Sequence, residues 1–377
     1  MIEYRVVSGL YIKIRSSLAR LCNCSPVYVP TRDDCYFDAD VTNEKTRIDN
    51  QVVNNHVLMM KNLTKVFHPR SGEPLLAVDH LSLGIPHGEC FGLLGQNGAG
   101  KTTTFKILTG DETMTSGSAS IDGFDVVRDV AEVRQRMGYC PQFDALIDLM
   151  TGRELLWMYC RLRGVPEQAI SDTVNKLAKD ISVYEHIDKC TKTYSGGNKR
   201  KLSTAIALCG DPTLIFLDEP SSGMDPVARR MLWNSLSQVI VSGKSIVITS
   251  HSMEECEALC TRLAIMVNGQ FKCLGSAQHL KNKFGEGYTL IAKVGGMNFD
   301  TLPLRHFIQA TFPGSLLKDE HQGYIHYQLK TDQSWAQLFG IMERAKQQYN
   351  IEDYSISQTT LEQVFLNFTR EQRETED

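Results

Sequence analysis

The chain has 377 residues, which predicts two or three domains, and its 42% hydrophobic and 22% charged residues rule out disorder throughout. The formal net charge is only −4, so the whole chain offers no electrostatic case for binding nucleic acid. The longest stretch without Lys, Arg, Asp or Glu, residues 231–243, is too short and too polar to cross a bilayer. The 11 cysteines lack a disulfide-like spacing, so we expect reduced thiols in an intracellular chain.

Residues 1–55 differ in character from the rest of the chain. Residues 6–21 carry basic and apolar side chains at helical spacing, whereas 26–55 are rich in Asp, Asn and Thr and show little periodicity. We therefore predict a linker or juxtamembrane-like segment over 1–55. The basic stretch has two interpretations: contact with an anionic membrane surface, or a solvated chain end.

From residue 57 onward, short apolar runs alternate with amphipathic stretches. The predicted strands are 57–67, 76–85, 90–94, 213–217, 245–249 and 263–267. The predicted helices are 102–109, 153–161, 169–180, 199–208 and 227–241. This alternation indicates an α/β fold with buried parallel strands.

The pattern changes after about residue 280. Strands are predicted at 288–294, 323–329 and 354–357, and helices at 302–310, 334–349 and 360–368. We expect a small domain of β-α-β type at 281–377 that regulates and does not catalyse, because it has no Gly-rich loop and no clustered His, Asp or Glu. In its last helix Leu361, Val364, Phe365 and Phe368 share one face. That face either docks on the rest of the chain or on a twin chain, or only completes a local core.

The most specific motif lies between a predicted strand and a predicted helix. It fits G-x-x-x-x-G-K-[ST] and consists of Gly95, Gln96, Asn97, Gly98, Ala99, Gly100, Lys101 and Thr102. Glycines let the backbone wrap closely around phosphate oxygens, and the helix N-terminus adds the positive end of its dipole. Lys101 is expected to reach the β- and γ-phosphates of a nucleotide, and the Thr102 hydroxyl to ligate Mg²⁺.

A second cluster of polar residues follows the other predicted strands. One apolar strand ends in Asp218, placed to hold Mg²⁺, and Glu219, which is then free to orient and polarise an attacking water. Gln142 offers a neutral amide to the metal, and the His251 imidazole can hydrogen-bond a γ-phosphate. Taken alone, Gln142 and His251 are weak indications of a nucleotide site. Their order and spacing among the other candidate motifs make them more specific.

A Ser-Gly-Gly turn opens the helix predicted near residue 199. It consists of Ser195, Gly196, Gly197 and Asn198, and it forms a second helix N-terminus suited to a phosphate. One nucleotide does not need two such cradles in one chain. The pair suggests that two chains share their sites.

Together these segments resemble the nucleotide-binding domain of ABC transporters over about residues 57–280. Residues 95–102 resemble the Walker A loop, and Gln142 is at the Q-loop position. Residues 195–198 resemble the signature motif, with Asn198 where Gln is commoner, and 214–219 resemble Walker B. The D-loop then falls at 222–225, with Asp225, and the switch histidine at His251.

The resemblance implies ATP and Mg²⁺ as cofactors. The implied catalytic residues are Lys101, Glu219 and His251, and the metal ligands are Thr102, Gln142 and Asp218. ATP contacts would run from Gly95 through Thr103, while Ser195, Gly196, Gly197 and Asn198 would act in trans on a second nucleotide-binding domain. The adenine-stacking position falls on Phe67, where the family commonly has Tyr; Phe67 is otherwise interpreted as a core side chain at a strand end.

Further details resemble the A subfamily of lipid transporters: residues 194–203, the Gly-Met-Asp-Pro at 223–226, and residues 360–365. The implied architecture is a P-loop ATPase core at 56–280, with a parallel sheet, an antiparallel β subdomain and a helical subdomain. A small α+β regulatory domain at 281–377 would follow, as in the C-terminal nucleotide-binding domain of a full-length member.

The resemblance also implies a function. The chain would be the ATP-hydrolysing motor of a lipid transporter, acting as a dimer of nucleotide-binding domains at the cytoplasmic face of a membrane. Family members are large membrane proteins, so we expect this chain to be a cut-out, an isoform or a fragment, cytosolic or peripheral by itself, whose partner transmembrane domains handle the lipid. One alternative is a spanless isoform that binds ATP or sequesters a partner. A soluble ABC ATPase acting on nucleic acid is disfavoured by the near-neutral charge and the single P-loop.

Overall fold

The computed structural model describes residues 38–50, 56–69, 73–285, 287–295, 301–321, 323–329 and 333–373, with side chains up to residue 369. The basic helix predicted at 6–21 lies outside these ranges. Of the described residues, 66–69 and 73–76 belong to a different compact unit, the hairpin-tip unit, from the remaining ones.

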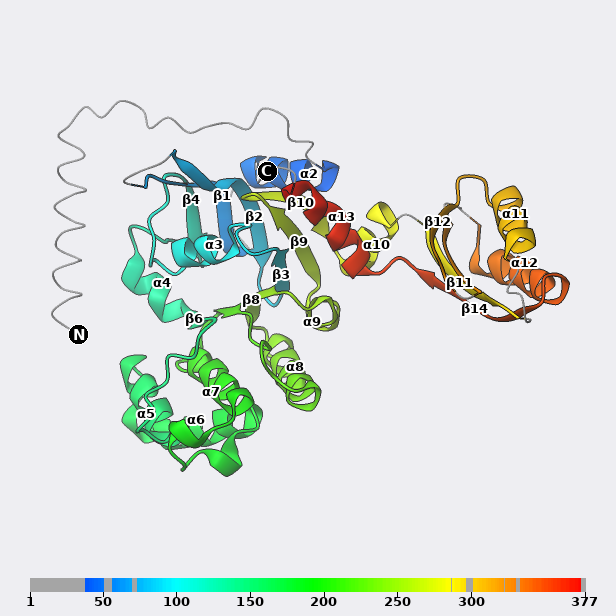
Figure 1. The fold of residues 1–377 in the computed structure, drawn as a ribbon. Coiled ribbons are helices and arrows are strands. Elements are labelled where there is room, and N and C mark those ends of the chain that lie inside the picture. Colours follow the sequence, from blue (N-terminus) through cyan, green and yellow to red (C-terminus); the bar gives the residue numbers. More distant parts are fainter. Residues whose placement is uncertain are drawn as a thin grey trace. The chain divides into compact units, whose positions relative to one another are not determined.

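A six-stranded sheet lies at the centre of the fold, in the order β10-β9-β3-β8-β7-β6 (Figure 1). Its strands are β3 (Cys90–Gly95), β6 (Met137–Cys140), β7 (Leu214–Asp218), β8 (Ser245–Ser250), β9 (Arg262–Val267) and β10 (Gln270–Gly275). β10 pairs antiparallel with β9, and the other pairs are parallel. Every residue of β3, β7 and β8 is buried, as expected for parallel strands covered on both faces. The predicted buried strands are confirmed, and β6 and β10 are additions to them.

One face of this sheet is covered by a second sheet, of order β2-β1-β4-β5, and by helix α3 (Lys101–Leu108). The strands are β1 (His56–Phe67), β2 (Leu75–Pro86), β4 (Ser116–Ile121) and β5 (Phe124–Asp125), and helix α4 (Val130–Arg136) follows. Phe105 of α3 packs edge-on against Phe216 of β7, with ring centroids 5.3 Å apart. This antiparallel sheet is the β subdomain that the resemblance implied.

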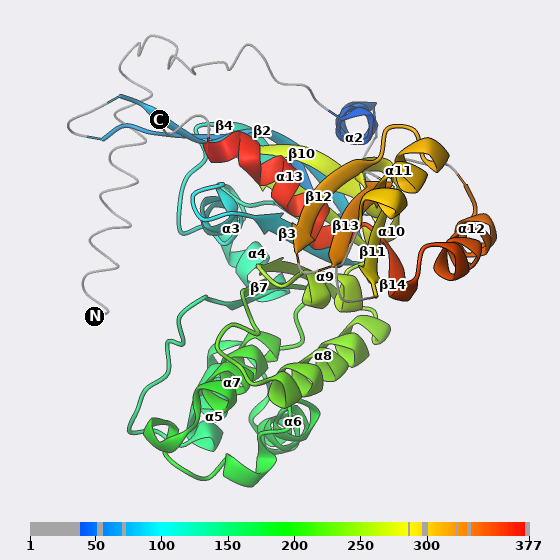
Figure 2. The ribbon, with the colours of Figure 1, turned by 45° about the vertical axis from the view of Figure 1, so that its right-hand side comes forward.

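Helices cover the opposite face. They are α5 (Gly152–Leu162), α6 (Glu167–Asp180), α7 (Gly196–Leu208), α8 (Pro226–Val241) and α9 (Met253–Leu259), with short 3₁₀ turns at Tyr184–His186 and Thr191–Thr193. Figure 2 shows α5, α6 and α7 packed together as a helical subdomain. Their apolar faces share one core with alternate side chains of the central strands, such as Ile215 and Ile246. The α/β fold class is therefore confirmed.

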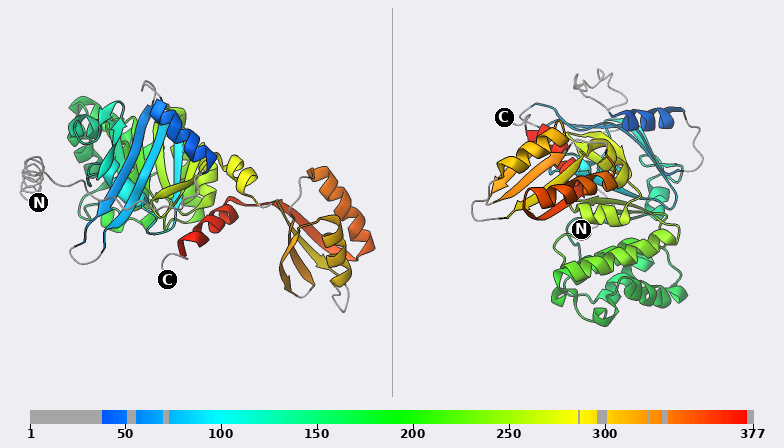
Figure 3. Two further views of the ribbon diagram at one scale, coloured as in Figure 1. Left: turned by 90° about the horizontal axis from the view of Figure 1, so that it is seen from above. Right: turned by 90° about the vertical axis from the view of Figure 1, so that its right-hand side faces the viewer.

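The chain then enters a smaller α+β domain through helix α10 (Ala277–Phe284). Four antiparallel strands pair in the order β12-β13-β11-β14, and α11 and α12 cover one face of the sheet (Figure 3). The strands are β11 (Tyr288–Val294), β12 (Leu316–His321), β13 (Tyr324–Leu329) and β14 (Ile351–Gln358), and the helices are α11 (Leu302–Thr311) and α12 (Trp335–Gln348). The predicted strands and helices of this region are confirmed. β12 was not predicted, because its exposed, charged residues resemble a loop.

The last helix, α13 (Leu361–Arg373), returns to the central sheet and lies beside α10 (Figure 1). Leu361 and Val364 are fully buried in a cluster that includes Leu94 of β3 and side chains of β9. The Phe368 ring meets the Phe284 ring of α10 edge-on, with centroids 5.0 Å apart. Of the three interpretations of this amphipathic face, docking on its own chain is the one that the structure supports.

The prediction of an irregular linker is wrong for residues 39–50, which form helix α2 (Ala39–Asn50). The helix is polar and buries only Glu44 and Ile48. The Glu44 carboxylate accepts a hydrogen bond from the Gly84 N–H of β2 at 2.9 Å and pairs with Arg47. Burial alone would raise the pKa of Glu44, but these hydrogen bonds lower it. A buried carboxylate thus anchors a helix that lacks an apolar stripe.

Docking of α13 predicts that Leu361→Ala destabilises the protein by about 2–5 kcal/mol, because it leaves a cavity among fully buried side chains. Leu366→Ala on the same helix, at a side chain that is 44% exposed, should change stability by about 0.5 kcal/mol or less. Urea unfolding followed by circular dichroism compares the two variants. Equal stabilities for both would contradict the docking of α13.

Candidate active site

The strand order brings four sequence motifs to one edge of the central sheet. β3, β8, β7 and β6 are neighbours and run parallel, so their carboxyl ends lie along the same edge. The phosphate-loop motif follows β3, and His251 follows β8. Glu219 follows β7, and Gln142 follows β6 at a distance of two residues. Residues separated by more than a hundred positions in the sequence are therefore adjacent at this edge.

The loop after β3 has a backbone that requires glycine. Gly98 and Gly100 have φ values of +82° and +104°, in the left-handed region. A Cβ on Gly100 would also lie 2.4 Å from the Ala77 carbonyl oxygen, whereas a Cβ on Gly98 would meet nothing within 4 Å. Gly100 immediately precedes α3, so the loop N–H groups and the helix N-terminus form one continuous cradle.

Lys101 lies within this cradle and is only 6% exposed. Its Nζ donates hydrogen bonds to the Gly95 and Gln96 carbonyl oxygens at 2.7 and 3.0 Å. Burial lowers the pKa of Lys101, and the nearby negative charges of Glu219 and Asp218 oppose that shift. Thr102, the next residue, is exposed on the first turn of α3.

Asp218, at the end of β7, is 2% exposed and accepts a hydrogen bond from the Thr249 hydroxyl at 2.5 Å. Burial raises its pKa, while the Thr249 hydrogen bond and the charges of Lys101 and Arg200 oppose that effect. Within the described ranges, no group of three or more His, Cys, Asp or Glu side chains could hold a metal ion. The oxygen donors of Asp218, Thr102 and Gln142 suit a hard cation such as Mg²⁺ that takes its remaining ligands from water or phosphate.

Glu219 is the residue that connects the motifs. Its φ is +50°, unusual for a residue with a side chain, and its N–H donates to the Thr249 carbonyl and hydroxyl oxygens, both at 3.1 Å. One carboxylate oxygen accepts from Gln142 Nε2 at 3.2 Å, and the other pairs with His251 Nε2. The structure thus brings Gln142, Glu219 and His251 into direct contact, as a candidate general base with two orienting partners.

The signature residues lie elsewhere on the surface. Ser195 is the N-cap of α7, and its hydroxyl accepts from the Asn198 N–H at 3.3 Å. Ser195 and Gly196 are exposed, unlike the buried Lys101, and a Cβ on Gly196 would meet nothing within 4 Å. An exposed helix N-terminus with an open backbone is accessible to a group from another chain.

Two further sequence-predicted residues have local roles in this structure. Asp225 caps α8, because its carboxylate accepts from the Ala228 N–H at 3.1 Å. Phe67 is half-buried at the end of β1, in the hairpin-tip unit, and its contact with adenine stays a prediction.

Sequence analysis missed two buried polar residues beside the site. Arg200 of α7 is 3% exposed and donates to the carbonyl oxygens of Asp218 and Glu219. Glu255 of α9 is fully buried and accepts from the Ser250 hydroxyl at 2.5 Å and from Trp233 Nε1 at 3.0 Å. Burial raises the pKa of Glu255, and these hydrogen bonds oppose the shift. In the sequence, both residues could have been noticed as charged side chains at helix positions that otherwise face the core.

Comparison with known families agrees with this geometry. A model of the ABC transporter family matches residues 78–222, and a model of the ABCA1-like C-terminal R1 regulatory domain matches residues 285–358. The chain belongs to the ABC transporter family. It carries an ABC ATPase domain followed by an A-subfamily regulatory domain.

The chain is similar to curated A-subfamily proteins. It is 60% identical over 337 residues to the phospholipid-transporting ATPase ABCA3 of Homo sapiens, covering 88% of this chain and 20% of that protein. It is 54% identical over 346 residues to ATP-binding cassette sub-family A member 17 of Mus musculus, covering 90% and 20%. It is 51% identical over 344 residues to the retinal-specific phospholipid-transporting ATPase ABCA4 of Homo sapiens, covering 90% and 15%. The chain thus spans about a fifth or less of the length of these relatives.

Solved structures agree on the fold. A dimeric post-hydrolysis ATP-binding cassette, MJ0796, bound to ADP and Pi, has a TM-score of 0.54 at 21% identity, covering 58% of this chain and 98% of that one. The ATP-binding subunit of an ABC transporter has a TM-score of 0.55 at 24% identity, covering 60% and 93%. Among the described helices of the present chain, none has the length and apolar character that a membrane crossing requires.

Proposed function

We propose that the chain is the ATP-binding and ATP-hydrolysing motor domain of an A-subfamily lipid transporter. In this proposal residues 56–280 form the C-terminal nucleotide-binding domain of the transporter, and 281–377 form its regulatory domain. The observation that carries the proposal is the contact of Glu219 with both Gln142 and His251, at the edge that also holds the buried Lys101. The family match and the phospholipid-transporting relatives support it.

Each site residue then has a role that follows from its chemistry. The loop N–H groups from Gly95 to Thr103 bind phosphate oxygens, and Lys101 Nζ exchanges its carbonyl partners for the β- and γ-phosphates. Bound Mg²⁺ would neutralise charge on the phosphates, held by Thr102, Gln142 and Asp218. Glu219 orients and polarises the attacking water, and His251 holds the carboxylate and hydrogen-bonds the γ-phosphate.

The proposed motor is a dimer of nucleotide-binding domains. Ser195 to Asn198 of one chain would complete the site of the other, because residues 95–102 would already hold the nucleotide of their own chain and this second helix N-terminus is exposed. The Asp225 loop would lie at the same interface. ATP binding closes the dimer and hydrolysis reopens it, which is a population shift driven by the γ-phosphate.

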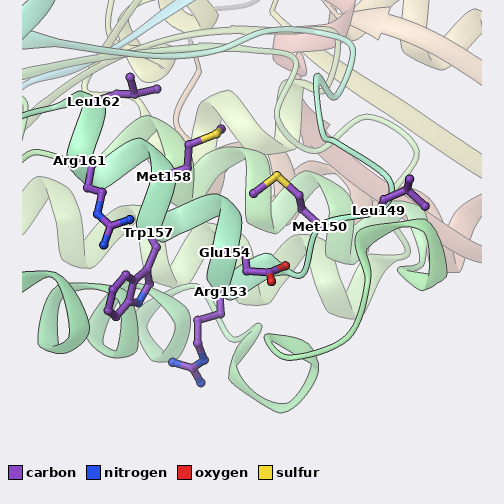
Figure 4. Close-up of a pocket in the computed structure, with 8 residues that line it drawn as sticks. All are labelled: Leu149, Met150, Arg153, Glu154, Trp157, Met158, Arg161 and Leu162. Atoms are coloured by element: carbon purple, nitrogen blue, oxygen red, sulfur yellow. The ribbon is translucent and has the colours of Figure 1, made fainter.

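The segment 143–156, after Gln142, is the proposed contact with the transmembrane domains, at the cytoplasmic face of a membrane. Phe143 and Leu149 are 82% and 83% exposed. A hollow of about 770 Å³ lies on α5 and the preceding loop, with Leu149 among its lining residues (Figure 4). It is lined by Leu149, Met150, Arg153, Glu154, Trp157, Met158, Arg161 and Leu162. Exposed apolar side chains around a hollow fit a protein partner, and that partner would handle the lipid.

Lys101→Ala tests the phosphate-binding loop. We expect loss of ATP binding or hydrolysis, because a charge-assisted contact to phosphate is worth about 1.5–3 kcal/mol in binding and more in the transition state. The matched control is Lys106→Ala, at an exposed lysine of the same helix. A nucleotide titration and a phosphate-release assay measure both steps, and values equal to those of the control would reject this loop as the nucleotide site.

Glu219→Gln separates ATP binding from hydrolysis. Glutamine keeps the shape of the side chain but cannot act as a base, so ATP should still bind while phosphate release falls by about 100-fold or more. The variant should accumulate as an ATP-bound dimer, detected by light scattering. Glu254→Gln, at an exposed position of α9, is the control. Turnover near that of the parent chain would exclude Glu219 as the water-activating group, and binding without turnover in the parent would favour a sequestering module.

Ser195→Arg tests whether the signature motif acts in trans. The arginine side chain is larger than serine and positively charged, so it should block closure of the dimer and abolish hydrolysis. A dilute monomer should still bind ATP with its usual affinity. Ser171→Arg, at an exposed position of α6, adds the same charge away from the motif. If the monomer loses ATP binding in parallel with hydrolysis, the shared-site arrangement is wrong.

A further inference from the structure

Arg200 lies in the second turn of α7, the helix whose N-terminus is capped by Ser195. Its guanidinium reaches out of the helix to two loops at the active edge of the sheet. Nε donates to the Pro220 carbonyl oxygen at 3.2 Å, and Nη2 donates to the carbonyl oxygens of Glu219, at 2.9 Å, and Asp218. Nη1 donates to the Pro141 carbonyl oxygen and, at 3.2 Å, to an Asp144 carboxylate oxygen. Five acceptors thus match the five N–H groups of one arginine.

Three of these acceptors are consecutive carbonyl groups of one turn, at residues 218–220. Glu219, at the centre of the turn, has the left-handed φ of +50°, which a residue with a side chain adopts only where surrounding contacts hold it. The same backbone conformation aims the Glu219 carboxylate at Gln142 and His251. Arg200 therefore holds the main chain that directs the proposed base.

The remaining acceptors, Pro141 and Asp144, flank Gln142 in the loop after β6. Gln142 donates to the Glu219 carboxylate, so Arg200 holds both residues of this contact by their loops. The side chain of Arg200 is 4% exposed and that of Asp144 is 22% exposed, which shields the pair from water. A lysine has three donors at a single atom and cannot reproduce this planar arrangement across two loops.

We infer that Arg200 is a positioning residue for ATP hydrolysis, which fixes the Glu219 turn and the Gln142 loop to the helix that begins at Ser195. The inference rests on the proposed function. Arg200 itself touches neither nucleotide nor water in this role. It acts through the direction of the Glu219 carboxylate, so its loss should reduce kcat and leave nucleotide affinity nearly unchanged.

The test uses the full chain with Arg200→Lys and Arg200→Gln, and Lys176→Gln at an exposed lysine of α6 as the control. We expect kcat for ATP hydrolysis to fall by about 10- to 100-fold in both Arg200 variants, the scale of a misplaced catalytic group. The ATP dissociation constant should change by less than about threefold, and Lys176→Gln should behave as the parent chain. Unchanged kcat, or a loss of ATP binding equal to the loss of kcat, would overturn the inference.

A second measurement separates the Glu219 turn from the signature helix. Arg200→Lys is combined with Glu219→Gln, and the ATP-dependent dimer is measured by light scattering. The double variant should form the dimer as Glu219→Gln alone does, because Arg200 acts on a carboxylate already removed. Loss of the dimer would assign the effect of Arg200 to the Ser195 helix and overturn the inference. A parent chain without ATPase activity would instead reject the proposed function, which keeps the two failures distinct.

Discussion

Three ionisable side chains, Lys101, Asp218 and Glu219, are buried together at the carboxyl edge of the central sheet, and the rest of the site depends on keeping them there. Charges removed from water are costly unless they are paired and hydrogen-bonded. The burial of Lys101 lowers its pKa and that of Asp218 raises its pKa, while their mutual attraction opposes both shifts. One cation facing two carboxylates leaves an excess of negative charge, which Arg200 helps to balance from α7.

This charge balance explains why the surrounding polar groups point inward. The Thr249 hydroxyl donates to Asp218, and Gln142 donates to Glu219, so each carboxylate has a donor besides the charged groups. The backbone provides the remaining constraint, through the left-handed turn at Glu219 and the glycine loop before α3. Side chains with fixed partners on a fixed backbone form a preorganised site, which is what the proposed activation of water by Glu219 needs.

The sequence allowed prediction of the parts of this site that depend on local pattern. An apolar run such as 245–249 can be detected as a buried strand, and the spacing of 95–102 is itself the geometry of a phosphate loop. Helix α2 was missed because its stability comes from Glu44 meeting a backbone N–H 40 residues away, and no apolar stripe marks it. Arg200 was missed for the same reason, because its acceptors lie on loops 18 to 59 residues distant. Long-range hydrogen bonds leave little trace in a single sequence.

Helix α10 connects the two domains. It also contacts α2 and α13, which are distant from it in sequence. Lys283 and His279 of α10 each bind the carboxylate of Asp40, in the first turn of α2, at 2.7 Å. On the other side, α13 packs on α10 through a core that includes the fully buried Leu280. The regulatory sheet therefore begins and ends at helices that are packed against each other.

These two contacts of α10 differ in physical character. The apolar contact with α13 is buried and insensitive to pH, whereas the Asp40 pairs are partly exposed and individually weak. Hydrogen bonds from Lys283 and His279 lower the pKa of Asp40, so the stabilisation that it contributes is present above its ordinary value of 3.8 and is lost only as the pH falls through the lowered value. At neutral pH both contacts persist. The buried packing of α10 on α13 therefore ties the two ends of the regulatory sheet to each other.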